Sequence, residues 1–340
     1  MEITRCLALS VALCAALAAS ASTRTTAPPA PLPTDPKALL QLASQVNGLH
    51  GSGMKPWHVH ASWRAVDRQK HVTSQGTLEE WWAAENQYKI ACASAGFQQT
   101  LYVTDHGAWI IGDPDTPNYN FSLAAAMFTD PLPDRESISA LNLQLLQHRQ
   151  RDLILTCVAP KSNPPLPQYC FTDNLPAVRV IARADARTGL SAIARFQGQY
   201  VAQQIEILRQ RKDEIDVQVD QIEPISTVSA ADFAPPPGAL PASAHPVFVD
   251  SSLLQDSRIS GKLPQYPAMA RTMGVQGTVV LQATIARDGT IADLKVVSGP
   301  EMLVHPAMEA VKSWQYRPYL LGGKPVSIRT EIDVIFSLGP

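Results

Sequence analysis

Three strand-like stretches lie near the C-terminal end of the chain, and in the first and third of them apolar side chains alternate with polar or smaller ones. The first stretch begins after Gly277, the second ends at Val297, and the pair Asp288-Gly289 lies between them. An Asp-Gly pair between two alternating runs is among the strongest local signals for a β-hairpin. The third stretch, residues 326–336, alternates in the same way. A period of two predicts strands that bury one face, so this region is predicted to form three antiparallel strands.

Two helices are predicted beside these strands. Pro267 suits the first turn of a short helix, and Gly274 suits the residue that ends it. Further along the chain, Leu303, Ala307 and Trp314 are spaced so that they share one face of a second helix. The predicted order is therefore helix, strand, strand, helix, strand.

Residues 260–338 closely resemble the TonB C-terminal family. The resemblance rests on motifs in the order Tyr266-Pro267, Gly277, Asp288-Gly289, Ala310-Val311, Trp314-Gln315-Tyr316-Arg317-Pro318 and Gly323-Lys324-Pro325-Val326. It implies a small periplasmic module, built from a three-stranded antiparallel sheet and two helices, that docks partner peptides and is not an enzyme.

The resemblance also implies a partner-binding strand. In the family, the last strand and the loop before it receive the N-terminal peptide of an outer-membrane receptor, and an exposed sheet edge offers backbone groups to such a peptide. The charged side chains at 329, 331 and 333 have a second interpretation, because charges also protect a solvated edge from aggregation. The partner-binding residues carried onto this chain are Ser327, Ile328, Arg329, Thr330, Glu331, Ile332 and Asp333.

The larger, upstream part of the chain also follows a period of two. Strands are predicted at 58–65, 76–82, 87–93, 99–104, 108–111, 153–158, 169–172, 177–183, 191–197, 203–209 and 215–222, and helices at 37–46, 123–128 and 138–148. Many successive antiparallel strands with few helices predict an α+β protein, in which a curved sheet wraps around helical segments.

The layout of residues 37–235 resembles the LolA/LolB-like lipoprotein carriers. One helix is followed by a long meander that ends in Asp232-Phe233-Ala234-Pro235-Pro236. The resemblance implies an incomplete barrel that holds a lipid or acyl chain against its helices. A generic antiparallel sheet domain is the alternative interpretation.

Prolines divide the chain into segments. Clusters in 22–36 and in 236–255 are typical of linkers, because proline cannot donate to a sheet ladder and the small residues around it bury little surface. The predicted organisation is a signal peptide at 1–21, a Pro-rich linker at 22–36, the half-barrel-like domain at 37–235, a Pro/Ala-rich linker at 236–255 and the TonB-like domain at 256–340.

The N-terminal segment predicts export to the periplasm. Arg5 precedes an apolar run from Cys6 to Ala19, and Ala19-Ser20-Ala21 offers a small-residue cleavage site. This order is typical of a secretory signal peptide. An uncleaved signal that anchors the protein is the alternative. TonB energy transducers carry a histidine in their membrane helix, whereas the first histidine here is His50, well beyond the apolar run.

Three cysteines follow the predicted signal peptide. Cys157 and Cys170 flank a proline-rich stretch, and in an oxidising compartment we expect a disulfide that closes this loop. Cys92 lies in an alternating apolar run and is predicted to be a buried free thiol.

Other chemistry finds little support in the sequence. A formal net charge of −2 argues against a nucleic-acid partner. His58 and His60 share one face of a predicted strand, but the sequence supplies no third metal ligand beside them. No nucleophile or phosphate-loop motif is present, so we expect no enzyme activity, no cofactor and no metal.

The sequence therefore predicts a periplasmic TonB-family protein that docks peptides of an outer-membrane receptor or another envelope protein by strand addition. Two alternatives stay open. One is a TonB-like energy transducer held by an uncleaved anchor, and the other is a periplasmic carrier with a lipid or acyl chain in its first domain.

Overall fold

The computed structural model describes residues 31–51, 53–113, 119–150, 153–162, 165–172, 175–183, 186–209 and 214–338. By its contacts, Pro31–Pro340 forms one compact unit. The predicted signal peptide and residues 22–30 of the first predicted linker lie outside the described residues. In the part of the chain that is described, no helix is both long and apolar enough to cross a membrane.

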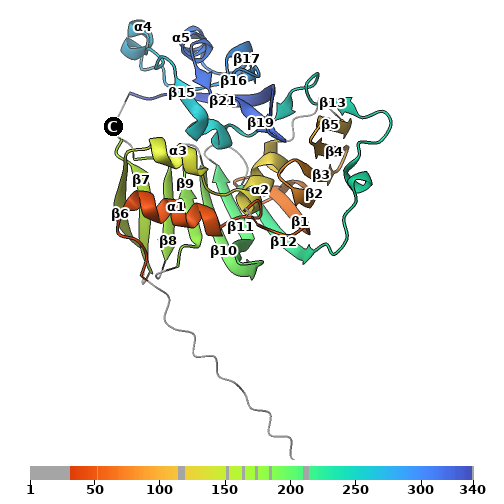
Figure 1. Ribbon diagram of the computed structural model, residues 1–340. Helices are drawn as coiled ribbons and strands as arrows, with labels where there is room; N and C mark the ends of the chain where they lie inside the picture. The colour runs from red at the N-terminus through yellow and green to blue at the C-terminus, as the bar shows by residue number, and fades with distance from the viewer. Residues whose placement is uncertain are drawn as a thin grey trace, which may run out of the picture. The chain divides into compact units, whose positions relative to one another are not determined.

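Thirteen strands of the described chain form one antiparallel sheet, in the order β13-β5-β4-β3-β2-β1-β12-β11-β10-β9-β8-β7-β6 (Figure 1). These strands are β1 (Trp57–Val66), β2 (Val72–Ala84), β3 (Gln87–Ser94), β4 (Phe97–Thr104), β5 (Gly107–Gly112), β6 (Leu143–Gln150), β7 (Leu153–Pro160), β8 (Gln168–Thr172), β9 (Val178–Ala182), β10 (Ala186–Phe196), β11 (Gln199–Arg209), β12 (Glu214–Pro224) and β13 (Leu240–Pro241).

Strand β1 lies inside this sheet because it pairs on one side with β2 and on the other with β12, the last strand of the meander. Its side chains alternate in burial. Val59, Ala61 and Trp63 are buried, whereas His58 and His60 lie on the opposite face. The period of two in the sequence is thus the period of burial in the strand.

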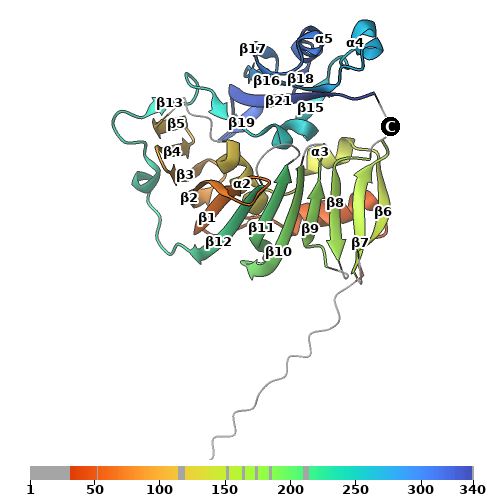
Figure 2. The same ribbon diagram turned by 180° about the vertical axis from the view of Figure 1, so that it is seen from behind.

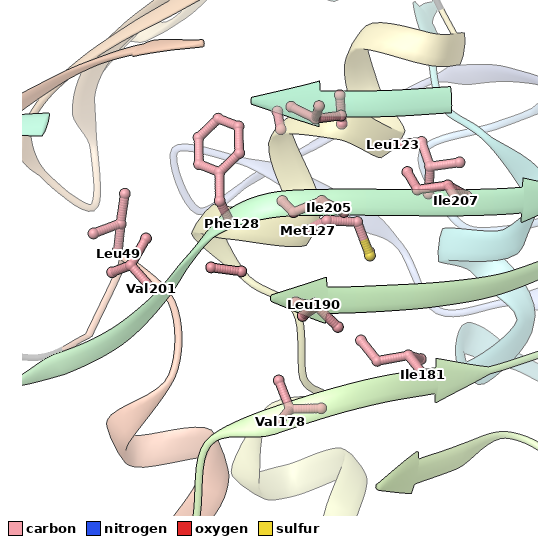
Figure 3. Close-up of a cluster of buried hydrophobic side chains, with 14 of the residues drawn as sticks. Leu49, Leu123, Met127, Phe128, Val178, Ile181, Leu190, Val201, Ile205 and Ile207 are labelled. Carbon is pink, nitrogen blue, oxygen red and sulfur yellow. The ribbon is translucent and has the colours of Figure 1, made fainter. Parts of the chain in front are cut away.

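Helices α1 (Pro36–Val46) and α2 (Tyr119–Thr129) pack on one face of the sheet, which Figures 1 and 2 show from opposite sides. The carboxylate of Asp35 caps α1 by accepting a hydrogen bond from the Ala38 backbone N–H, at 2.7 Å. The core of this part of the molecule lies between the helices and the sheet. Figure 3 shows side chains of α2 beside side chains of β9, β10 and β11, among them Leu123, Met127, Phe128, Ile181, Leu190, Ile205 and Ile207.

One predicted helix was wrong. Residues 138–148 were expected to be helical, but α3 (Arg135–Ala140) ends early and β6 begins at Leu143. Leu and Gln, which dominate this stretch, favour helices as isolated residues. Pairing with β7 and burial of Leu143 outweigh that preference, because propensity is a weak signal beside tertiary contacts.

The predicted disulfide is present. Cys157 in β7 lies directly opposite Cys170 in β8, and the two sulfur atoms are bonded. Cys92 in β3 is a buried free thiol, as predicted. Burial in apolar surroundings raises the pKa of Cys92 to about 12, so the residue is protonated at neutral pH.

The C-terminal part follows the predicted order of elements. Helix α4 (Ala268–Thr272) precedes β16 (Gly277–Ile285) and β17 (Ile291–Ser298), and α5 (Glu301–Lys312) precedes β21 (Ile328–Phe336). Leu303 and Ala307 of α5 pack against the buried face of β16 and β21. The alternating buried residues of β16 and β21 therefore meet the apolar face of the helix, with Ile291 and Leu294 of β17 partly buried beside them.

Shorter elements join this framework. The sheet contains a fourth strand, and its order is β14-β21-β16-β17, with β14 parallel to β21. The additional strand β14 comes from residues 236–255, the stretch predicted as a linker. The remaining short elements are η1 (Ala230–Phe233), β14 (Val247–Phe248), η2 (Ser251–Ser257), β15 (Arg258–Ser260), β18 (Gln315–Tyr316), β19 (Tyr319–Leu321) and β20 (Lys324–Val326).

Candidate docking edge and adjoining cavity

Strand β21 carries six of the seven predicted partner-binding residues, and Ser327 directly precedes it. Along its whole length β21 pairs with β16, from Gly277 opposite Phe336 to Ile285 opposite Ile328. The predicted residues divide between the two faces of the sheet. Ile328, Thr330 and Ile332 are buried on the face that meets the core, whereas Arg329, Glu331 and Asp333 are half-buried on the other.

The outer side of β21 holds a strand from the same chain. The backbone N–H of Val247 donates to the carbonyl of Ser327 at 3.1 Å, and the N–H of Val249 donates to the carbonyl of Arg329 at 3.0 Å. Strand β14 pairs only with Ile328 and Arg329, the first two residues of β21. The edge that was predicted to receive a partner therefore already accepts an extended, parallel segment at its beginning.

Side chains fix this segment in place. Phe248 and Val249 are buried. The guanidinium of Arg329 lies over the ring of Phe248, at 5.4 Å from its centroid. Asp250 pairs with Arg209 of β11 at 3.3 Å, and both side chains are at most 10% exposed. The Asp250 backbone N–H also donates to the hydroxyl of Ser122 in α2, at 3.1 Å. The segment is thus tied to the terminal sheet and to the larger sheet at once.

A cavity of about 440 Å³ lies beside this segment. Its lining comes from strands β2 to β5, from α2, from residues 247–253 and from the hairpin of β19 and β20. Aromatic and aliphatic side chains make up much of the lining, including Trp82, Tyr88, Phe121, Phe248, Tyr319 and Leu321. A cavity of this size and character suits an apolar organic ligand.

His50 adds a charged side chain to the cavity lining. Its Nδ1 lies 2.6 Å from Asp130 and its Nε2 lies 2.9 Å from Glu80, whose side chain is fully buried. The imidazole also stacks beside the rings of Trp57 and Trp82. Burial lowers the pKa of His50, but Asp130 and Glu80 raise it, and the net pKa is about 10. His50 is therefore a cation at neutral pH, held between two carboxylates.

The other histidines singled out in the sequence also face carboxylates. His58 Nε2 lies 3.0 Å from Glu79, and His60 Nδ1 lies 3.1 Å from Asp220. His58 additionally stacks on Trp81. These contacts hold both imidazoles beside carboxylates on the outer face of β1, away from the cavity.

Among the described residues, one group of three carboxylates is close enough together to hold a metal ion, and it consists of Glu206, Glu214 and Asp216. Cations already pair with this group. Lys70 Nζ lies 2.5 Å from Glu214, and Arg64 Nε lies 2.8 Å from Asp216. Burial and the neighbouring Glu214 carboxylate raise the pKa of Glu206. The cluster is accounted for by these ion pairs.

Sequence comparison matches the C-terminal part of the chain to known proteins. Residues 262–338 match the family model described as Gram-negative bacterial TonB protein C-terminal. Protein TonB of Vibrio cholerae is 33% identical over 98 residues, which are 28% of this chain and 39% of that protein. The match thus spans about two-fifths of the length of that relative. This part of the chain is TonB-like.

Solved structures resemble the two parts of the molecule separately. The solution structure of the Pseudomonas aeruginosa TonB C-terminal domain is 28% identical and covers 24% of this chain and 86% of that one, with a TM-score of 0.22. A LolA superfamily protein from Nitrosomonas europaea covers 58% of this chain and 97% of that one, with 7% identity and a TM-score of 0.41.

Sequence reasoning missed the segment beside β21 and the charged group formed by His50, Glu80 and Asp130. Val247, Phe248 and Asp250 lie in a stretch whose prolines and alanines are typical of a linker. The signal that could have found them is the apolar triplet Val247-Phe248-Val249, which interrupts that composition. Nothing in the local sequence distinguishes His50 or Glu80, because their partners are distant along the chain.

Proposed function

We propose that the TonB-like region docks an extended peptide of another envelope protein by strand addition along β21. The resemblance of residues 262–338 to TonB C-terminal domains supports this assignment. The observation that carries it is the pairing of β14, because a strand of the same chain uses the outer side of β21 through main-chain hydrogen bonds. An incoming peptide would extend the sheet in the same way.

The direction of the strand predicts which backbone groups a peptide would use. The carbonyls of Ser327 and Arg329 point to the outer side. Because alternate residues of a strand direct their backbone groups to the same side, the groups of residues 331, 333 and 335 point outward as well. Specificity would come from the half-buried charged side chains of Arg329, Glu331 and Asp333.

Proline substitution tests the proposal. Asp333→Pro removes an outward N–H while the ladder to β16 stays intact, and proline is tolerated where the N–H faces away from the partner strand. The full chain would be titrated with synthetic N-terminal peptides of outer-membrane receptors, and we expect at least a tenfold loss of affinity. Asp333→Asn is the matched control, because it removes the side-chain charge but keeps the backbone N–H.

A second control addresses the other edge of the sheet. Val296 lies in β17, the opposite edge strand, and its side chain is exposed. Val296→Pro is expected to leave peptide affinity unchanged. Equal losses from Asp333→Pro and Val296→Pro, or no loss from Asp333→Pro, would contradict docking along β21.

The cavity favours a second candidate function, a carrier of apolar molecules. Its volume of about 440 Å³ and its aromatic lining support the binding of a lipid or acyl chain. The full chain would be titrated with a fluorescent fatty-acid probe. Phe121→Trp is expected to weaken probe binding, because the larger ring would occupy part of the cavity. Saturable binding that Phe121→Trp leaves unchanged would place the probe elsewhere.

A further inference from the structure

Residues Val247–Asp250, which we call the cis strand, contact the docking edge and the cavity together. Their backbone N–H groups bond to the carbonyls of Ser327 and Arg329. On the other side, Val247 and Phe248 contribute to the cavity lining. A single four-residue segment therefore closes one wall of the cavity and fills the beginning of the edge.

The cis strand and a docked peptide would need the same backbone groups. An acceptor carbonyl at the edge of a sheet directs its bond to one neighbouring strand, so two extended segments cannot lie side by side on the same residues. A peptide that pairs along the whole predicted stretch from Ser327 to Asp333 must therefore replace the cis strand at its first residues.

We propose that the cis strand is an intramolecular competitor for the partner peptide, and that its displacement opens the cavity. The inference rests on the proposed docking along β21. The partner that fits is an extended segment with the chemistry of the occupant, which is a short run of β-branched and aromatic residues followed by an acidic one. Docking of such a segment and access of an apolar ligand to the cavity are then coupled.

The contacts of the cis strand explain how docking reaches the cavity. Asp250 is held by Arg209 of β11 and by the hydroxyl of Ser122, which lies in the helix that lines the cavity. Phe248 is stacked under Arg329 of β21. When a peptide replaces the cis strand on the carbonyls of Ser327 and Arg329, the contacts of Asp250 and Phe248 still hold the cis strand against the cavity. They therefore set the strength of the competition.

The first test removes the competitor without altering β21. The double variant Val247→Pro, Val249→Pro loses both donor N–H groups, and proline keeps the extended conformation of the residues before it. The probe is a fluorescein-labelled peptide with the sequence of residues 245–251, His-Pro-Val-Phe-Val-Asp-Ser. We expect it to bind the full-length variant at least tenfold more tightly than the wild-type chain, because the competent edge is no longer occupied.

Two controls accompany this measurement. Val247→Thr keeps both N–H groups and changes only a partly buried side chain, and we expect affinity within threefold of the wild type. Asp250→Asn weakens the pair with Arg209 but keeps both N–H groups, and we expect an intermediate affinity. Circular dichroism would verify that each variant is folded. Equal affinity of the probe for the wild type and for the folded proline and Asp250→Asn variants would overturn the proposal.

The second test reads the cavity through Cys92, whose buried thiol belongs to its lining. In a chain with Cys6→Ser and Cys14→Ser, the rate of modification by a small thiol reagent reports access to the cavity. We expect a saturating concentration of the probe peptide to raise this rate at least fivefold. An unchanged rate while the peptide is bound would overturn the coupling.

Failure of the proposed function would look different. Receptor peptides could bind neither the wild type nor the double proline variant, while the probe peptide binds the proline variant. In that case partner docking fails and the intramolecular competition stands. If receptor peptides bind both chains with equal affinity and leave Cys92 protected, docking stands and the competition fails.

Discussion

At the scale of single residues, His50 illustrates how a buried charge is kept. Its imidazole lies between Asp130 and Glu80, and Glu80 is fully buried. Removal of one partner of a buried pair leaves a charge without compensation, which costs far more than the loss of a surface pair. His50 therefore stabilises the fold mainly by compensating the buried charge of the Glu80 carboxylate.

The first prediction concerns the loss of this cation. His50→Ala is expected to lower the free energy of unfolding by about 3 kcal/mol, because the Glu80 carboxylate would remain buried without its partner. Urea unfolding of the full chain measures the change. His71 is the matched control, since its exposed imidazole pairs with Asp67 at the surface, and His71→Ala is expected to cause no measurable loss. Equal effects of the two substitutions would contradict the role assigned to His50.

The second prediction concerns the pH dependence of stability. The pKa of His50 rises on folding from its ordinary value of 6.5 to about 10. A raised pKa means that the folded state binds the proton more tightly, so this stabilisation is complete below pH 6.5 and is lost as the pH rises toward 10. Groups that face His50 are Asp130, Glu80 and the rings of Trp57, Trp82 and Tyr88.

Urea unfolding of the wild type and of His50→Gln across this pH range gives the measurement. Titrating groups away from this site are common to both proteins, so the difference in unfolding free energy reports His50 together with the Asp130 and Glu80 carboxylates that it contacts. We expect the advantage of the wild type to shrink steadily as the pH rises. A difference that is constant from pH 6.5 to pH 10 would show that His50 does not hold its proton in this way.

At the scale of elements, the turn between β16 and β17 shows why a glycine is needed. Gly289 has a φ of +85°, and a Cβ built there would meet the carbonyl oxygen of Tyr316 at 1.8 Å. The Tyr316 N–H also donates to the Gly289 carbonyl, at 2.9 Å. The Asp-Gly signal in the sequence thus marks both a tight turn and a close approach of a second segment.

The third prediction follows from this contact. Gly289→Ala is expected to destabilise the protein by more than about 2 kcal/mol, because left-handed backbone strain adds to a backbone clash. Gly274→Ala is the matched control, since Gly274 also has a positive φ but no atom lies within 4 Å of its added Cβ. It is expected to cost roughly 1 kcal/mol from strain alone. Thermal unfolding ranks the two, and the reverse order would contradict the contact.

At the scale of the whole molecule, the two large parts share an apolar cluster. Val103 and Ile110 of the larger sheet, Val249 of the cis strand and Tyr316 and Leu321 of the terminal part belong to it. A hydrogen bond from Arg317 to the Ser137 hydroxyl, at 2.5 Å, also connects the terminal part with α3. Val249 of the cis strand is therefore buried against side chains of both the larger sheet and the terminal part.

The fourth prediction concerns residues 236–255. A solvated linker is cut readily by proteases, whereas a segment with buried side chains and paired backbone resists them. Phe248 is 2% exposed, so chymotrypsin is expected to leave the bond after Phe248 intact in the native chain. Mass spectrometry of timed digests gives the measurement, with urea-unfolded protein as the control. Rapid cleavage after Phe248 in the native protein would favour a free linker.

The sequence by itself determined most strands, the first helix, the hairpin at Asp288-Gly289 and the Cys157–Cys170 disulfide, because these depend on short-range patterns. It also predicted the faces of β21, since burial follows the alternation of residues 328–336. Only the tertiary structure decided that residues 143–150 pair as a strand, that His50 meets Asp130 from 80 positions away and that Val247–Val249 lie on β21. The last two contacts join residues that are distant along the chain and leave no periodic trace in the local sequence. Strand β6 pairs with the neighbouring β7, and there tertiary burial outweighed the helix preference of Leu and Gln.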